Sequence, residues 1–179
     1  MRIIDIQPTI TQAGEIPLLI GMLEDNTHYW RSHLGRVSVE TLCWQARPEG
    51  HSIGMLLLHN AAVEAYWLQQ VLAGETTEPE LWRTLRDDQV DQFAGKWGKP
   101  PKKTLAWYYE QQDSVRQRTL EIVSQQTDTT ALFGGDTQFS LRWLVHHVIT
   151  HEAYHCGQIL LLADLLRASR NASQKDTAR

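Results

Sequence analysis

The chain has 179 residues, 42% of them hydrophobic and 21% charged, so it can bury the core of one globular domain and is short for two. Its net charge of −4, from 17 Lys and Arg against 21 Asp and Glu, argues against nucleic-acid binding. Two cysteines make a disulfide framework improbable, and no apolar run reaches the roughly 20 residues of a membrane span, so we expect a cytoplasmic protein without membrane contact.

The hydrophobic pattern is helical almost throughout, and residues that start or stop helices divide it into segments. We expect a first helix over 17–34, which Gly35 ends. A short helical turn over 39–44 follows, with Ser38 as its N-cap. The next long helix is expected over 52–72.

Three further helices are predicted after residue 78. Segment 79–93 carries apolar residues at approximate helical spacing, which indicates a short amphipathic helix. A long helix is expected over 104–126 with Thr104 as its N-cap, and another over 140–166 with Ser140 as its N-cap.

The predicted fold is all-α: a four-helix bundle in which a long connection crosses over between the second and third long helices. The one strand-like segment, 3–6, is too short and isolated to form a sheet. We expect a single domain over 1–168. Residues 169–179 are polar, and we expect them to form a disordered C-terminal tail.

The segment 143–166 contains two histidines where a buried helix face normally carries aliphatic side chains. The stripe consists of Leu144, Val148, His151, His155, Ile159, Leu162 and Leu166, at intervals of three or four residues. Burying a polar group without a partner costs roughly 1–3 kcal/mol. His151 and His155 are therefore either hydrogen-bonded core residues or ligands of a metal ion.

Helix geometry limits how these histidines can bind an ion. His147 and His155 lie about 12 Å apart along a helix, too far to share one ion, whereas His151 and His155 are one turn apart. A third ligand must come from another helix, and His59 is the best candidate because it lies mid-helix on a predicted core face. Three imidazoles leave a coordination position open, which is typical of catalytic sites.

Residues 151–155 also spell HExxH, the signature of zincin metalloproteases, in which the glutamate acts as general base. This alternative is weaker because no His or Glu follows His155 to supply a third ligand. The predicted fold also has no sheet that could bind an extended peptide. We expect Glu152 to lie behind the ligands or on the surface.

The chain resembles the DinB-like superfamily, which includes YfiT-like metal hydrolases and the bacillithiol and mycothiol S-transferases. The resemblance is carried by Ser-Ile-Gly at 52–54 ahead of His59, by the H-x-x-x-H pair His151 and His155, and by Cys-Gly-Gln at 156–158. Many relatives have Arg where this chain has Cys156, so a positive charge beside the site is missing.

This resemblance implies a four-helix bundle that binds a divalent metal ion, often zinc or nickel. Its ligands would be His59, His151 and His155. It also implies a small-molecule substrate, the possible use of a low-molecular-weight thiol as cofactor, and a homodimer. The expected function is a metal-dependent thiol S-transferase or hydrolase. The alternative is a non-catalytic, stress-related bundle that uses the ion structurally or as a sensor.

Other side chains receive weaker assignments. We expect His147 to lie behind the ligands or to pack, and Cys156 to be a small buried or half-buried residue that does not bind the ion. Gln158 and Tyr154 either face the ion or lie on the helix surface. The remaining histidines, His28, His33, His51 and His146, are expected to be surface or capping residues.

Overall fold

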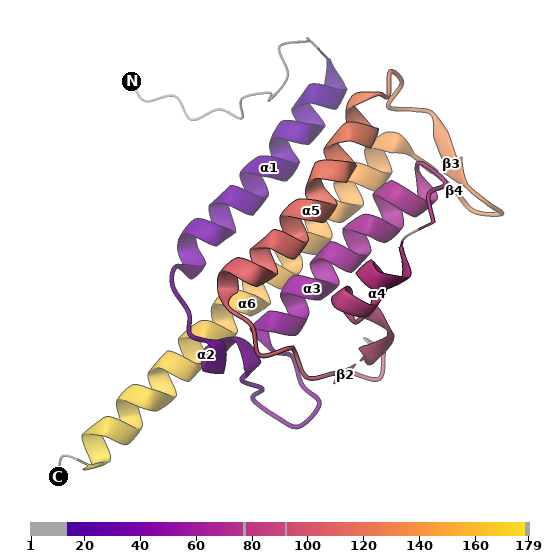
Figure 1. Cartoon of the computed structure of the whole chain (residues 1–179). Coiled ribbons are helices and arrows are strands. Elements are labelled where there is room, and N and C mark those ends of the chain that lie inside the picture. Colours follow the sequence, from indigo (N-terminus) through magenta and orange to yellow (C-terminus); the bar gives the residue numbers. More distant parts are fainter. Residues whose placement is uncertain (1–13, 77, 92, 178–179) are drawn as a thin grey trace, which may run out of the picture.

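The computed structural model in Figure 1 describes residues 14–76, 78–91 and 93–177. Within these residues four long helical elements form a bundle, which confirms the predicted all-α fold. They are α1 (Glu15–Leu34), α3 (Ile53–Glu64) with its π-helical continuation η1 (Ala65–Val71), α5 (Leu105–Ser124) and α6 (Leu141–Thr177). None of the described helices has the length and apolarity that crossing a membrane requires.

Hydroxyl side chains cap the N-termini of four helices; three of them are predicted N-caps, and the fourth, Ser52, is the first residue of a predicted helix. Each hydroxyl accepts a hydrogen bond from the backbone N–H three residues further along, which satisfies one of the free donors of a first helical turn. The caps are Ser38 before α2 (Val39–Cys43), Ser52 before α3, Thr104 before α5 and Ser140 before α6. The predicted helix starts are therefore close to the observed ones.

The prediction of one helix over 79–93 is wrong in its second half. Helix α4 (Pro79–Leu85) ends at Arg86, whose φ of 56° lies in the left-handed region, and the 3₁₀-helix η2 (Asp87–Gln89) follows. A residue with a positive φ cannot continue a right-handed α-helix. The apolar residues beyond this break belong to a hairpin instead.

Two short antiparallel hairpins lie within the described residues, and the sequence analysis predicts neither. They are formed by β1 (Val90–Asp91) with β2 (Lys96–Trp97), and by β3 (Leu132–Gly134) with β4 (Gln138–Ser140). Strands of two or three residues are too short for an alternating pattern to be recognised. The strand candidate 3–6 lies outside the described residues.

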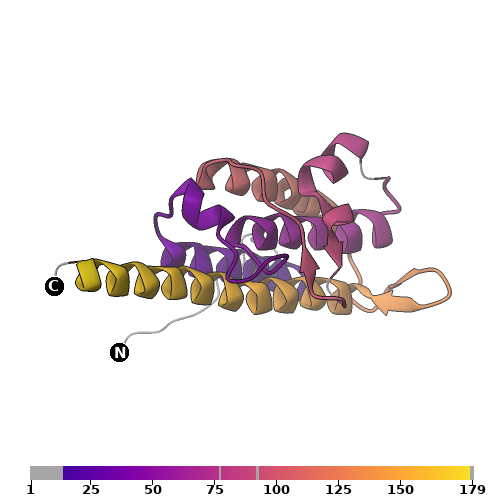
Figure 2. The same cartoon turned by 90° about the horizontal axis from the view of Figure 1, so that it is seen from below.

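Helix α6 continues to Thr177, whereas the polar composition predicts a disordered tail after residue 168. Residues 167–177 contain neither Gly nor Pro, so nothing in this segment breaks the helix. Arg170 also forms an ion pair with Glu40 of α2, at 2.9 Å from nitrogen to oxygen. Figure 2 shows that α6 extends past the other helices at this end.

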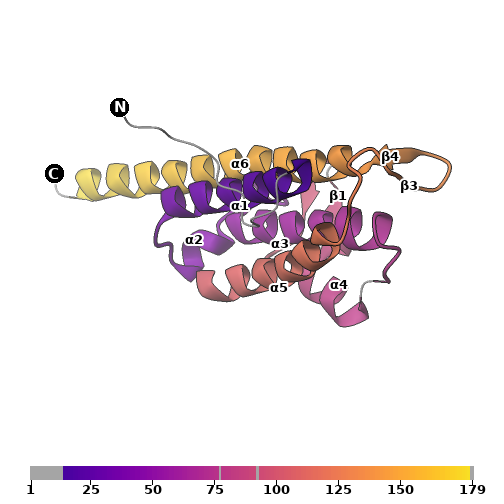
Figure 3. The same cartoon turned by 90° about the horizontal axis from the view of Figure 1, so that it is seen from above.

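The helices pack so that α6 contacts both α1 and α3, while α3 also contacts α5 (Figure 3). The long connection between η1 and α5 contains α4, η2 and the β1–β2 hairpin, in agreement with the predicted crossover. Helix α3 lies in the centre, and nearly all of its side chains are buried. A polar group on the inner face of α3 or α6 is therefore placed between helices.

Candidate metal centre

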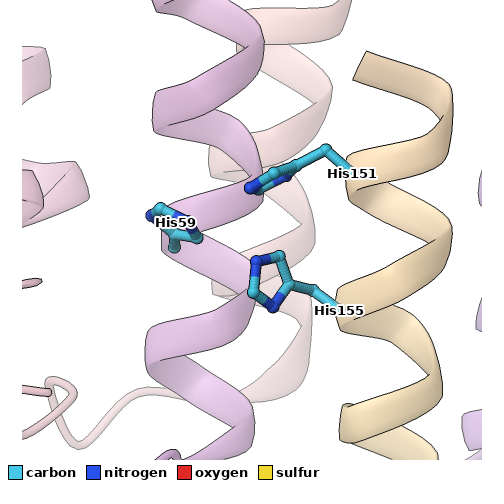
Figure 4. A group of neighbouring side chains, drawn as sticks. All are labelled: His59, His151 and His155. Carbon is cyan, nitrogen blue, oxygen red and sulfur yellow. The ribbon is translucent and has the colours of Figure 1, made fainter. Parts of the chain in front are cut away.

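Three histidine side chains from two helices point toward one another inside the bundle (Figure 4). His59 comes from α3, and His151 and His155 come from successive turns of α6. One nitrogen of each ring can be chosen so that all three lie within 4.8 Å of one another. A tetrahedral zinc ion holds its imidazole nitrogens about 3.4 Å apart, so small ring rotations would fit them to an ion. The structure thus brings together the three residues that the sequence singles out.

Two of these imidazoles, His151 and His155, are kept neutral, the form in which histidine binds metals. Burial, followed by the neighbouring imidazoles of His155 and His59, lowers the pKa of His151 to about 3. Burial likewise lowers the pKa of His155 to about 4, against a hydrogen bond to Gln158 that raises it. Their lone pairs are therefore available at neutral pH.

A hydrogen bond orients one of the three rings. The Nδ1 atom of His155 lies 2.8 Å from Oε1 of Gln158, one turn further along α6. An amide oxygen can only accept, so His155 carries its proton on Nδ1 and presents the lone pair of Nε2. Gln158 thus lies at the site. Tyr154, by contrast, is 65% exposed, with its ring centroid 4.9 Å from that of His155.

An open cavity of about 340 Å³ lies against His151 and His155. Its other walls include Trp97 and His51, whose ring centroids are 4.5 Å apart. His51 was expected on the surface or at a cap, but it is half-buried, and burial followed by the charge of Arg47 lowers its pKa. The sequence does not point to these two residues, because His51 lies in a loop and Trp97 in a two-residue strand, and neither segment carries a periodic signal.

Glu152 does not face the histidines, although it is adjacent to His151 in the sequence. Glu152 is buried, and its carboxylate accepts hydrogen bonds from Trp30 Nε1 at 2.9 Å and Thr27 Oγ1 at 2.8 Å. Asn26 and Arg116 donate to it as well, at 3.0 and 3.4 Å. The carboxylate is engaged between helices, which argues against the general base of a zincin.

Arg116 connects Glu152 to a second buried carboxylate. Its Nε and one terminal nitrogen donate to the two oxygens of Glu64, at 2.8 and 2.9 Å. Another terminal nitrogen donates to Thr27 Oγ1 at 2.9 Å. This buried network of Glu64, Arg116 and Glu152 joins α3, α5 and α6, and Thr27 extends it to α1.

The remaining candidates on α6 pack against other side chains. His147 stacks on Trp143, with 4.8 Å between ring centroids and 10° between planes, and its centroid is 6.1 Å from that of His151. Cys156 is buried and lies 3.9 Å from Nδ2 of Asn60. Burial raises the pKa of the Cys156 thiol, so it stays protonated, as suits a packing residue. The exposed histidines are His28, His33 and His146.

The family model described as mycothiol-S-transferase matches residues 18–171, which include all three clustered histidines. The chain belongs to the mycothiol-S-transferase family. This assignment confirms the resemblance to the DinB-like superfamily, of which the family is a part. A sequence comparison with curated proteins finds no match to the chain.

A comparison with solved structures supports the fold of this mycothiol-S-transferase family member. The crystal structure of a conserved protein from Enterococcus faecalis is similar to it, with a TM-score of 0.68 and 12% sequence identity. The similarity covers 88% of this chain and 99% of that one. At this level of identity the similarity concerns the fold.

Proposed function

We propose that the protein transfers a low-molecular-weight thiol to a small electrophile, using a divalent cation bound by His59, His151 and His155. The observation that carries this proposal is the convergence of three imidazoles beside an open cavity. Membership of the mycothiol-S-transferase family makes a mycothiol-type thiol the first candidate. In the reaction a carbon–sulfur bond forms, the leaving group departs with its electron pair, and the thiol proton passes to solvent.

Each part of the site has a role in this reaction. A bound divalent cation would lower the pKa of a thiol that reaches it and so supply thiolate at neutral pH. The histidines would hold the ion, and Gln158 would keep Nε2 of His155 directed at it. Imidazole ligands suit zinc and nickel, and we propose one of these two as the resident metal.

Hydrolysis is the second candidate, because the cavity is open to solvent and the same ion could activate water. The two reactions differ in what they consume. A transferase needs the thiol, whereas a hydrolase consumes the electrophile without it. A purely structural ion is disfavoured, because structural zinc sites have four protein ligands and no cavity beside the ion.

The decisive experiment combines metal analysis with a thiol assay. Untagged protein purified without chelator should contain near-stoichiometric metal, and should couple mycothiol to an aryl or benzyl halide. His59→Ala, His151→Ala and His155→Ala should each lose both the metal and the transfer activity, whereas His33→Ala, at an exposed position, should lose neither. Full activity in metal-free protein would overturn the proposal.

A further inference from the structure

The cavity beside the histidines has aromatic walls. Trp97 is buried and contacts His59 and His155, with centroid distances of 5.1 and 6.0 Å. Tyr154 and Phe93 form the outer wall. The volume of about 340 Å³ is within the range of ~300–1,000 Å³ that small-molecule sites occupy.

Phe93 is the most unusual of these residues because it is 96% exposed. It lies in the turn of the β1–β2 hairpin, and this turn is held in place from both sides. The Asp91 carboxylate accepts the backbone N–H of Ala94 at 2.9 Å, and Arg47 donates to the Gly95 carbonyl at 3.0 Å. The backbone N–H of Trp97 donates to the carbonyl of Glu49, also at 2.9 Å. The hairpin therefore presents a large apolar ring to solvent at the cavity mouth.

The charge of the cavity restricts what can occupy it. Among the described residues that line it, none carries a carboxylate, ammonium or guanidinium group. Its polar side chains are histidines and Gln158. In the metal-free protein a charged ligand group would therefore lose hydration without meeting a charged group among these lining residues, which is unfavourable. A flat, uncharged ring would instead cover the exposed faces of Phe93 and Tyr154.

We propose that the cavity mouth is a binding subsite for an uncharged aromatic group of the electrophilic substrate, held by Phe93, Trp97 and Tyr154. The assignment of this ligand as the electrophile rests on the proposed function. The binding of the ring itself depends only on the cavity walls. It can therefore be measured without metal, thiol or reaction.

The test uses the full-length, metal-free chain and calorimetric titration with 4-nitrobenzyl alcohol, an unreactive analogue of 4-nitrobenzyl chloride. The wild-type protein should bind the alcohol. Phe93→Ala and Tyr154→Ala should each weaken binding at least about fivefold, while Phe93→Trp should retain it. Leu132→Ala is the matched control, because Leu132 is 59% exposed on the other hairpin, and it should bind as the wild type does.

The anion 4-nitrobenzoate tests the charge restriction and should bind at least about tenfold more weakly than the alcohol. Absent binding of the alcohol, unchanged binding by Phe93→Ala and Tyr154→Ala, or equally tight binding of the benzoate would each overturn the proposal. Ring-dependent binding by a protein that transfers no thiol to 4-nitrobenzyl chloride would leave the subsite standing. That result would count against the proposed function alone.

Discussion

At the scale of single residues, His151 and Glu152 serve different parts of the molecule although they are consecutive. Adjacent positions on a helix differ in direction by about 100°, which takes one side chain to the histidine cluster and the other to the buried network. Glu152 has four hydrogen-bond donors around it, so it is held away from the cavity. The glutamate of this HExxH sequence is therefore not placed to act as the general base of a metalloprotease.

Gln158 should control metal affinity through the ring orientation of His155. Replacing Gln158 by Leu removes the acceptor for the Nδ1 proton, so Nε2 is no longer fixed as the ligand atom. Loss of such a supporting hydrogen bond typically lowers metal affinity about 10–100-fold. The dissociation constant of zinc can be measured by competition with a chromophoric chelator.

Two variants serve as controls for this measurement. Gln158→Glu keeps an acceptor and should hold the affinity close to that of the wild type. Gln111→Leu removes a glutamine whose side chain bonds to a backbone carbonyl of α5, away from the site, and should change nothing. Equal affinity of Gln158→Leu and wild type would contradict the positioning role.

At the scale of elements, the start of α3 depends on a close approach that only glycine permits. A Cβ atom at Gly54 would lie 2.6 Å from the hydroxyl of Tyr108 and 2.8 Å from Cβ of Pro100. Tyr108 is fully buried, and its hydroxyl donates to the carbonyl of Pro101. Helix α3, which carries His59, is thus fitted tightly against the start of α5.

Gly54→Ala should consequently destabilise the protein, by about 1–3 kcal/mol, the usual cost of overpacking a core. Urea unfolding followed by circular dichroism measures this change. The same substitution should cost less in a Tyr108→Phe background, where the hydroxyl is gone. Gly157→Ala on α6 meets no atom within 4 Å and should be neutral or stabilising. Equal effects of both alanines would refute the packing argument.

At the scale of the whole molecule, the buried network of Glu64, Arg116 and Glu152 connects helices that are far apart in the sequence. Arg116 is the cation between two carboxylates that are both almost fully buried. Removing one member of such a network leaves uncompensated charge inside the protein. The resulting loss of folding free energy is greater than the net stabilisation that the ion pairs provide.

Arg116→Met should therefore lower the free energy of unfolding by about 3–5 kcal/mol. The measurement is again urea denaturation, with Arg118→Met as the control. Arg118 also pairs with carboxylates, those of Glu75 and Glu121, but on the surface. Replacing Arg118 should therefore lower the urea concentration at the unfolding midpoint far less than replacing Arg116 does. Similar midpoints for the two variants would show that the network does not hold the helices together.

The sequence predicts the features that depend on local patterns. Helix caps such as Ser38 and Thr104 follow from residue type and position, and the pair His151 and His155 follows from helical spacing. The sequence also indicates His59 as the third ligand, because this histidine lies on the predicted core face of a second helix. Its role as a ligand remains a prediction.

Other features cannot be predicted from local patterns, because they depend on contacts between segments that are distant in the sequence. Phe93 and Trp97 reach the site through a hairpin of two-residue strands, which no periodicity reveals. The position of Glu152 depends on donors from α1 and α5. The rotation of about 100° per residue predicts that Glu152 points away from the direction of His151. It does not predict which side chains Glu152 contacts.

The π-helical segment η1 has a consequence for how the chain can change in length. It follows α3 directly, beyond His59 and before the crossover that carries the β1–β2 hairpin. A π-type turn holds more residues per turn than an α-helix, so deleting a residue from Ala65–Val71 could be absorbed by a return to α-helical pairing. Such a deletion would shift α4, the next element along the chain, relative to α3 while leaving His59 in place. Deletions at η1 thus offer a route by which the start of the crossover can diverge while the three histidines stay fixed.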